Sequence, residues 1–221
     1  MNTYRKTARI VGALFLTVMV TWFIGSELIG SILNAPDYLV NVYPNRIRVI
    51  IGVLFELIQA AAVVGIAVMM FPILKKYNER IALGYIVFRI LECAMLIVAS
   101  ISPLLLITLS QEYLKTGAPD ASAFQALSTL FIALREHWTL LVLAIFYSSA
   151  AIMFYYVLYQ TKLIPRFISV WGLIGAALAL TTPWLGTLLG IPMGLNELFL
   201  GVWLIVKGFD PSAIKAQMST K

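Results

Sequence analysis

The chain has 221 residues, of which 61% are hydrophobic and 12% are charged, and its formal net charge is +6. Soluble domains carry about a quarter charged residues, so this composition excludes an ordinary soluble domain, and recurring apolar runs of about 20 residues indicate membrane-spanning helices. The basic residues lie at the ends of these runs, as topology signals do, and this distribution excludes a nucleic-acid partner.

Six apolar segments follow one another along the chain. They cover residues 10–33, 48–74, 81–109, 137–159, 164–189 and 191–206. The first is longer than the apolar region of a secretory signal, and no small-x-small cleavage site follows it. A turn rich in Gly and Pro separates the last two, which predicts a tight helical hairpin. We therefore expect an all-α bundle of six transmembrane helices that forms one domain over residues 1–221.

The connection before the fourth segment has apolar residues at spacings of three and four, which is typical of an amphipathic helix. These residues are Phe124, Leu127, Leu130, Phe131 and Leu134. Asp120 or Ser122 can cap the start of this helix. It either lies in the membrane interface or extends the fourth segment as one long helix, and the simplest placement is packing against the bundle.

Lys and Arg residues are unevenly distributed between the two sides that this topology defines. If the N-terminus is cytoplasmic, eleven lie inside: Arg5, Lys6, Arg9, Lys75, Lys76, Arg80, Lys162, Arg166, Lys207, Lys215 and Lys221. Four lie outside, namely Arg46, Arg48, Lys115 and Arg135, and Arg89 falls within a segment. Because cytoplasmic loops carry the excess of basic residues, we expect both termini in the cytoplasm (N-in/C-in) and the protein in the plasma (inner) membrane.

Ionisable residues inside the predicted spans are the candidate site residues. They are Glu27, Glu56, Arg89, Glu92 and Glu197, with His137 beside Glu136 at the outer mouth of the fourth segment. A charge near the bilayer centre costs about 2.5–3.5 kcal/mol on insertion scales, so such groups usually face a partner or a wet cavity. Arg89 and Glu92 are three residues apart and can therefore pair on one helix face.

For any one of these residues, a role in helix packing is the simpler explanation. As a set, four carboxylates around one guanidinium need a proton, a bound cation, or a further base that reaches in. Candidate bases are Arg46, Arg48, Arg135 and His137. We therefore predict that Glu27, Glu56 and Glu197 turn inward around one polar cavity open to the outside. The expected partners are membrane lipids and a small molecule or cation, and the oligomeric state is left open.

We therefore expect a membrane protein that binds or transports a small solute, lipid or cation through this cavity, and two other functions remain open. One is an intramembrane enzyme of the lipid-hydrolase type, with His137 or a glutamate as base and Ser148, Ser149 or Tyr147 nearby. The other is an accessory subunit whose buried charges are structural. With one His and one Cys (Cys93), a zinc or haem site of ordinary ligands is not expected, and we predict no cofactor and no metal.

Four stretches of the sequence resemble a known family. They are "YRKTARIVGALF" (4–15), "IALGYIVFRILECAMLIV" (81–98), "LIPRFISVWGLIGA" (163–176) and "LNELFLGVWLIVKGF" (195–209). Together they resemble the bacterial membrane-protein family called domain of unknown function 4386, over nearly the whole chain. Arg89 and Glu92 lie in the "FRILE" motif and Glu197 in the "NEL" motif. The resemblance implies a multi-pass bacterial membrane protein and brings no established activity.

Overall fold

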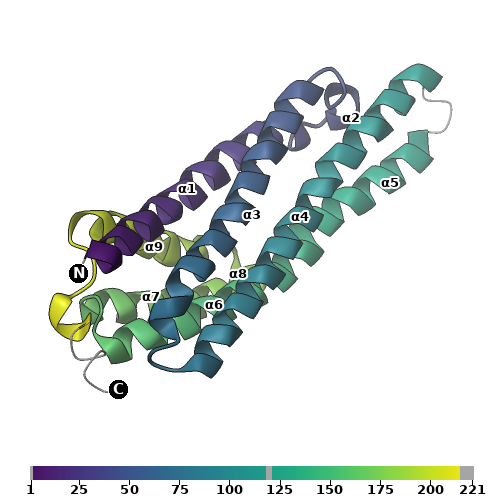
Figure 1. Ribbon diagram of the computed structural model, residues 1–221. Coiled ribbons are helices and arrows are strands. Elements are labelled where there is room, and N and C mark those ends of the chain that lie inside the picture. Colours follow the sequence, from purple (N-terminus) through teal and green to yellow (C-terminus); the bar gives the residue numbers. More distant parts are fainter. Residues whose placement is uncertain (1, 118–120, 215–221) are drawn as a thin grey trace.

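The computed structural model describes residues 2–117 and 121–214, and all regular structure in these ranges is helical. The longer helices are α1 (Asn2–Leu33), α3 (Arg46–Leu74), α4 (Glu79–Thr116), α5 (Ala121–Ala133), α6 (Leu140–Thr161), α7 (Arg166–Leu180) and α9 (Ile191–Val206). Shorter pieces are α2 (Tyr38–Asn41), a π-helical turn (Leu134–Thr139), α8 (Thr182–Leu185) and a 3₁₀ turn (Thr187–Gly190). Figure 1 shows them as one elongated bundle.

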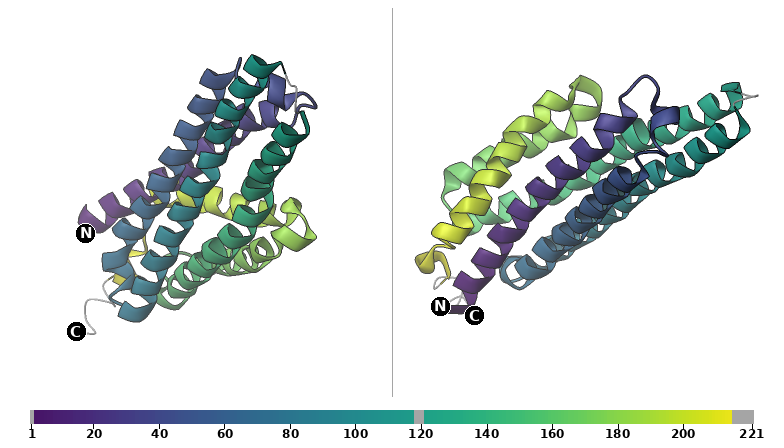
Figure 2. Two further views of the ribbon diagram at one scale, coloured as in Figure 1. Left: turned by 90° about the vertical axis from the view of Figure 1, so that its right-hand side faces the viewer. Right: turned by 90° about the horizontal axis from the view of Figure 1, so that it is seen from above.

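Six helices of the described chain form a closed ring, in the order α1, α3, α4, α6, α7 and α9, with α9 packed back on α1. At one end of this ring α1 begins, α3 turns into α4, and α6 turns into α7; we call it the basic end. There Lys76 donates a hydrogen bond to the hydroxyl of Tyr4. At the opposite end α1, α3, α4 and α5 extend beyond the α7–α9 hairpin (Figures 1 and 2).

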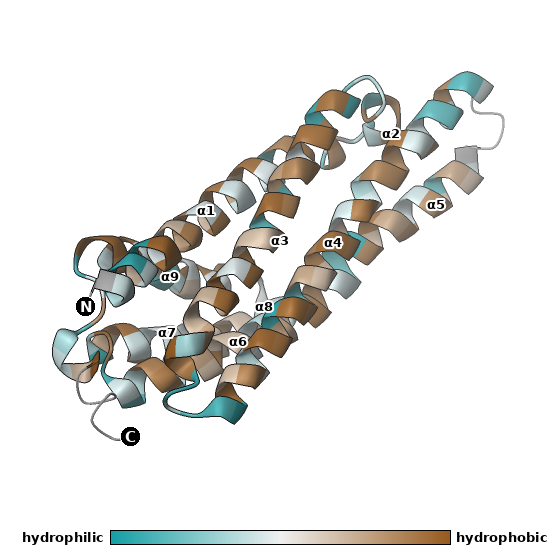
Figure 3. Cartoon of the chain, viewed as in Figure 1, coloured by the Kyte–Doolittle hydropathy of each residue, from teal (hydrophilic) through white to brown (hydrophobic). Residues whose placement is uncertain are grey.

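Five helices within the described residues are long and apolar enough to cross a membrane. They are Thr3–Leu33, Arg46–Leu74, Glu79–Thr116, Ser122–Thr161 and Thr187–Val206. Apolar residues cover most of their length, and hydrophilic ones gather near the ends of the bundle (Figure 3). Leu, Ile and Val side chains are widely exposed on this outer surface, as expected where lipid is the solvent. The chain is therefore an all-α protein of the multi-pass membrane type.

The fifth predicted span is shorter than expected. Helix α7 has 15 residues, or about 22 Å at 1.5 Å per residue, and it ends at Leu180 instead of continuing to residue 189. The separate short helix α8 follows, with Pro183 as its second residue, and Gly186 has a φ of 106°, which a side-chain-bearing residue rarely adopts. The tip of the hairpin carries exposed Trp184, Leu185 and Leu188.

The amphipathic segment before the fourth span extends that span. α5, the π-helical turn and α6 form one continuous helix over Ser122–Thr161, so the placement as one long helix is confirmed. It also packs on the bundle, because Ser102 donates to the carbonyl of Phe131 at 2.7 Å and Tyr38 hydrogen-bonds to Ser128 at 2.7 Å. Asp120, one of its two predicted caps, lies outside the described residues.

Small residues bring neighbouring helices close together. A Cβ atom on Gly12 of α1 would lie 2.5 Å from the carbonyl oxygen of Gly201 on α9, and one on Gly25 would lie 3.1 Å from that of Gly52 on α3. Close backbone approach of this kind is the usual basis of helix association in membranes. Two faces of α1 are therefore held by α3 and α9, which closes the ring.

Candidate functional site

The centre of the ring holds a buried ion pair. Arg89 and Glu92 lie on α4 and are 2% and 4% exposed. Nη1 of Arg89 donates to both carboxylate oxygens of Glu92, at 2.9 and 3.2 Å. The spacing of three residues predicted this pair, and the structure confirms it. A single charge buried without a partner has a high free-energy cost, and Arg89 and Glu92 each reduce this cost for the other.

Aromatic rings from two helices surround the guanidinium of Arg89. Its central carbon lies 5.4 Å from the ring centroid of Tyr85, one turn earlier on α4, and 5.6 Å from that of Tyr147 on α6. At these distances the ring faces attract the cation. The arginine is thus held from two sides by rings and from a third by Glu92.

Helix α9 brings a second carboxyl group to the same place. Glu197 is 7% exposed. It forms no salt bridge within the described residues, but Arg89, Glu92 and Tyr147 lie close enough to act on it electrostatically. The preceding residue, Asn196, donates to the carbonyl of Ile168 on α7 at 2.9 Å, which fixes the rotation of α9 against α7. The side chain of Glu197 therefore faces the interior of the ring.

The aromatic wall is completed by Tyr155 of α6. Its ring lies against Gly172 of α7, where a Cβ atom would be only 2.4 Å from ring carbons. Tyr155 is 1% exposed, and Glu197 and Arg89 are among its neighbours. We call the set Tyr85, Arg89, Glu92, Tyr147, Tyr155 and Glu197 the Arg89 cluster.

The Arg89 cluster has unused hydrogen-bonding capacity. In the described part of the chain, six buried side-chain atoms have no hydrogen-bond partner: Tyr85 Oη, Arg89 Nε, Ser148 Oγ, Tyr155 Oη, Ser169 Oγ and Asn196 Oδ1. Three of them belong to the cluster itself. Buried polar atoms are nearly always satisfied by protein or by ordered water. The Tyr85 and Tyr155 hydroxyls and the Nε of Arg89 can therefore pair with ordered water without losing internal hydrogen bonds.

A second polar site joins α3, α4 and the π-helical turn. Both terminal nitrogens of Arg135 donate to the carboxylate of Glu56, and the Oγ of Ser100 donates to the same group at 2.8 Å. We call Glu56, Ser100 and Arg135 the Glu56 latch. A forked guanidinium–carboxylate pair of this kind is strong and geometrically specific. Arg135 is one of the four bases predicted as able to reach the buried carboxylates, and it compensates the charge of Glu56.

A proline makes room for Arg135 on α4. Pro103 lies inside α4 and has no N–H group, so it leaves the carbonyl of Ala99, four residues earlier, without its helical donor. Nη1 of Arg135 donates to that carbonyl at 3.0 Å. The arginine therefore binds a carboxylate and a vacant backbone acceptor at once.

The π-helical turn positions Arg135. Within Leu134–Thr139 the hydroxyl of Thr139 donates to the carbonyl of Leu134, five residues earlier, at 2.6 Å. A single π-helical turn inserts an extra residue and rotates the side chains that precede it. The apolar residues of the preceding amphipathic segment set which side of that helix packs on the bundle. The π-helical turn then directs the side chain of Arg135 toward α3 and α4.

Two predicted site residues lie elsewhere. Glu27 is exposed on α1, because Gly25 and Ile29 pack on α3 and Glu27 lies about 200° around the helix from Gly25. The expectation that Glu27 turns inward is wrong. His137 is exposed and, with Glu136, Trp138 and Trp184, lines a separate pocket of about 280 Å³. Glu56 and Glu197 belong to two different sites, so the acids are not arranged around one cavity.

Residues 10–208 match the model of a protein family described as Domain of unknown function (DUF4386). This range covers most of the 221 residues. The chain belongs to the DUF4386 family. The resemblance noted from the sequence motifs is thereby confirmed, and the Arg89 cluster and Glu56 latch both lie inside the matched region of this DUF4386 member. Comparisons with curated proteins and with solved structures gave no match.

Several site residues were not predicted from the sequence. Tyr85 is four residues before Arg89 and could have been found from helical spacing. Pro103 signals a free carbonyl at residue 99, but it does not indicate which donor fills it. Tyr155 and Ser100 carry no local signal, since only the ring arrangement places them beside charged groups.

Proposed function

We propose that this DUF4386 member binds a small cation, in the simplest case a proton, at the Arg89 cluster, and carries it or a coupled solute across the membrane. The observation behind this proposal is the burial of two carboxyl groups, Glu92 and Glu197, beside one guanidinium, Arg89. One negative charge is left uncompensated if both carboxyls are ionised. In an apolar interior such a charge is costly, so a proton or cation is the natural complement.

A purely structural role explains the cluster less completely. An ion pair that only fixes packing needs one acid and one base, as in the Glu56 latch. The Arg89 cluster adds a second acid and buried hydroxyl groups on Tyr85 and Tyr155 that lack partners among the described residues. Ionisable groups inside membrane spans that face a bundle interior commonly mark ion pathways and proton relays.

The enzyme interpretation gains no comparable support. In one form of it, His137 acts on Ser148, and these two residues are eleven positions apart on one helix, or about 16 Å along the axis. His137 is exposed, whereas Ser148 is fully buried. The cation-binding function therefore has the stronger argument.

The membrane arrangement that goes with this function is six crossings with both termini in the cytoplasm of a bacterial plasma membrane. The α7–α8 segment serves as the fifth crossing, and α9 serves as the sixth. Support comes from the basic end, where the loops that contain Lys75, Lys76 and Lys162 gather beside the start of α1. The Arg89 cluster then lies near mid-membrane, and the Glu56 latch lies about 12 Å further toward the outside along α4, from Glu92 to Ser100.

Infrared spectroscopy of the purified protein can test whether a buried carboxyl binds a proton. We expect the wild-type protein to show a carboxylic-acid band that titrates with pH. Glu197→Gln should remove this band, because the amide side chain has no carboxylic-acid group. Glu27→Gln is the matched control, since it makes the same chemical change on an exposed glutamate of α1, and it should leave the band in place.

Transport is tested by reconstituting the same three proteins in vesicles that contain a pH-sensitive dye. An imposed membrane potential should drive proton uptake in the wild type and in Glu27→Gln, and uptake should fall to the level of empty vesicles in Glu197→Gln. A wild-type protein with no titrating band and no uptake would refute the proposal and leave the structural role.

A further inference from the structure

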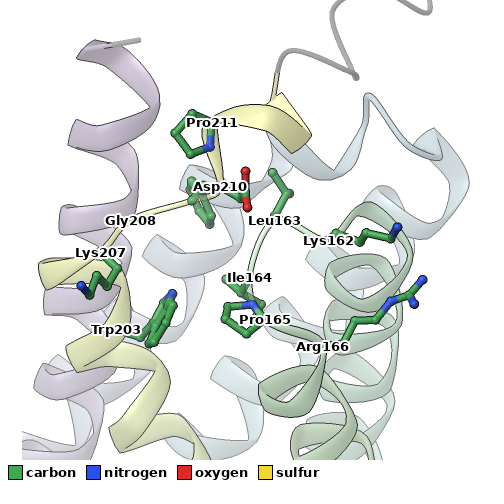
Figure 4. A pocket seen from close by; sticks show the side chains of 11 residues that line it. Lys162, Leu163, Ile164, Pro165, Arg166, Trp203, Lys207, Gly208, Asp210 and Pro211 are labelled. Carbon is green, nitrogen blue, oxygen red and sulfur yellow. The ribbon is translucent and has the colours of Figure 1, made fainter.

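A groove of about 460 Å³ opens at the basic end of the bundle, between the α6–α7 connection and the chain that follows α9. Lys162 and Arg166 lie on one side of it, Trp203 and Lys207 lie on the other, and Asp210 lies at its upper edge in the view of Figure 4. The backbone N–H of Asp210 donates to the carbonyl of Leu163 at 2.9 Å, which holds the two walls together.

The groove has an excess of positive charge. Among the described residues, no carboxylate forms a salt bridge with Lys162, Arg166 or Lys207. The one acid of the lining, Asp210, is already engaged, because it accepts hydrogen bonds from the backbone N–H and the hydroxyl of Ser212 at 2.7 and 2.5 Å. These bonds lower the pKa of Asp210. Arg166 lies over the ring of Tyr159 at 5.0 Å, so Lys162 and Lys207 are the cationic side chains most available to an anionic ligand.

Lys162 has a backbone conformation that glycine adopts more easily than lysine. It ends α6 with a φ of 55°, and it is the one residue other than glycine with a positive φ in the described chain. Glycine is preferred at this helix-ending position because it has no Cβ to strain. A lysine at position 162 is therefore conformationally less favourable than a glycine, and its role in ending the helix does not explain why a lysine is present.

The groove is amphipathic across the membrane boundary. Its floor includes Leu163, Ile164 and Phe209, which are almost completely buried, and its rim is basic. Below the rim, toward the membrane centre, α7 and α9 present the exposed apolar side chains of Phe167 and Val206. A ligand that fits has an anionic head and an apolar tail that continues along these helices.

We propose that this groove is a binding site for the headgroup of an anionic phospholipid from the leaflet at the basic end. Basic pockets between transmembrane helices bind such headgroups. Trp203 lies at the rim, at the depth that tryptophan prefers in membranes.

The test uses native mass spectrometry of the full-length protein in detergent, titrated with phosphatidylglycerol or with zwitterionic phosphatidylcholine. Lys162→Gly and Lys207→Gln should each weaken phosphatidylglycerol binding about fivefold, in line with the contribution of one basic residue near an anionic surface. Lys162→Gly relieves the backbone strain, so its thermal unfolding temperature should equal or exceed that of the wild type. Arg80→Gln is the matched control, because it removes one exposed charge of the basic end outside the groove.

We expect the affinity for phosphatidylglycerol to fall about fivefold in the two groove variants and to change little in Arg80→Gln. Phosphatidylcholine should bind weakly to all proteins. An equal loss in Arg80→Gln would show diffuse attraction to the whole basic end and overturn the site. Equal affinity for phosphatidylcholine would exclude recognition of an anionic head. If inorganic phosphate displaced phosphatidylglycerol at equal concentration, the groove would be a site for a soluble anion, and the lipid assignment would be wrong.

Discussion

The guanidinium of Arg89 donates to both oxygens of Glu92 and lies between the rings of Tyr85 and Tyr147. The effect on stability differs between removing one partner of this pair and removing both. Removing one member of a buried ion pair leaves the other charged and unsolvated, which costs about 3–5 kcal/mol, whereas replacing both with apolar residues is often neutral. Glu197 changes this balance, because it is a second acid beside the same arginine.

The asymmetry gives a prediction for stability. Arg89→Met should lower the free energy of unfolding by about 3–5 kcal/mol, since it strands Glu92 and Glu197. The double variant Arg89→Met/Glu92→Leu should recover part of this loss, and adding Glu197→Leu should recover more. Unfolding in mixed detergent measures these values, with Glu27→Leu as an exposed-acid control. Full recovery in the double variant would show that Glu197 is not coupled to Arg89.

At the scale of elements, Pro103 and the π-helical turn act as a matched pair. Pro103 leaves the carbonyl of Ala99 without a helical donor, and the π-helical turn places Arg135 where it fills that position while it binds Glu56. Both are local departures from α-helical geometry. Without Arg135 the carbonyl of Ala99 would lack a donor, and without Pro103 the guanidinium of Arg135 would lose this acceptor. Together they fasten the half of α4 that lies away from the basic end to α3 and to the long helix formed by α5 and α6.

A double-mutant cycle tests this pairing. Pro103→Ala supplies an N–H to the carbonyl of Ala99, so Arg135→Gln should destabilise the Pro103→Ala protein less than it destabilises the wild type. We expect a coupling of about 1 kcal/mol between the two positions. Pro72→Ala is the control, because Pro72 also lies inside a helix, α3, but near the basic end. If Pro72 and Pro103 coupled equally to Arg135, the proposed exchange of donors would not be specific.

At the scale of the whole molecule, a closed ring of helices surrounds the Arg89 cluster, and the α7–α9 hairpin covers only part of its height (Figure 2). Below the hairpin tip the interior is lined on all sides by protein. Beyond the tip α1, α3, α4 and α5 continue. The ring therefore isolates the cluster from lipid.

Orientation is tested by cysteine labelling in intact cells, in a Cys93→Ala background. Lys115→Cys, at the end of α4, should react with a membrane-impermeant reagent, and Tyr77→Cys, in the α3–α4 connection, should react only after lysis. Position 115 is preferable to the nearby Gly117, because the φ of 65° at Gly117 disfavours a cysteine. Labelling of Tyr77→Cys alone would reverse the assigned orientation.

Composition and local pattern determined much of this protein. The scarcity of charge and the long apolar runs predicted an all-α membrane bundle, because a helix satisfies its own backbone within lipid whatever its neighbours are. The i, i+3 spacing predicted the pair of Arg89 and Glu92, since both residues belong to one helix. The sixth segment was predicted with the bounds of α9, residues 191–206, because its ends have local turn signals.

Only the tertiary structure decided which ionisable residues meet. Glu27 is exposed because glycine packing fixes the rotation of α1 against α3, and that rotation depends on both helices. Arg135 reaches Glu56 through a π-helical turn and a carbonyl freed by a proline on another helix. Glu197 joins Arg89 only because α9 closes the ring. Each of these contacts depends on how helices rotate and pack against one another, and a single sequence records the residues of each helix without recording that rotation.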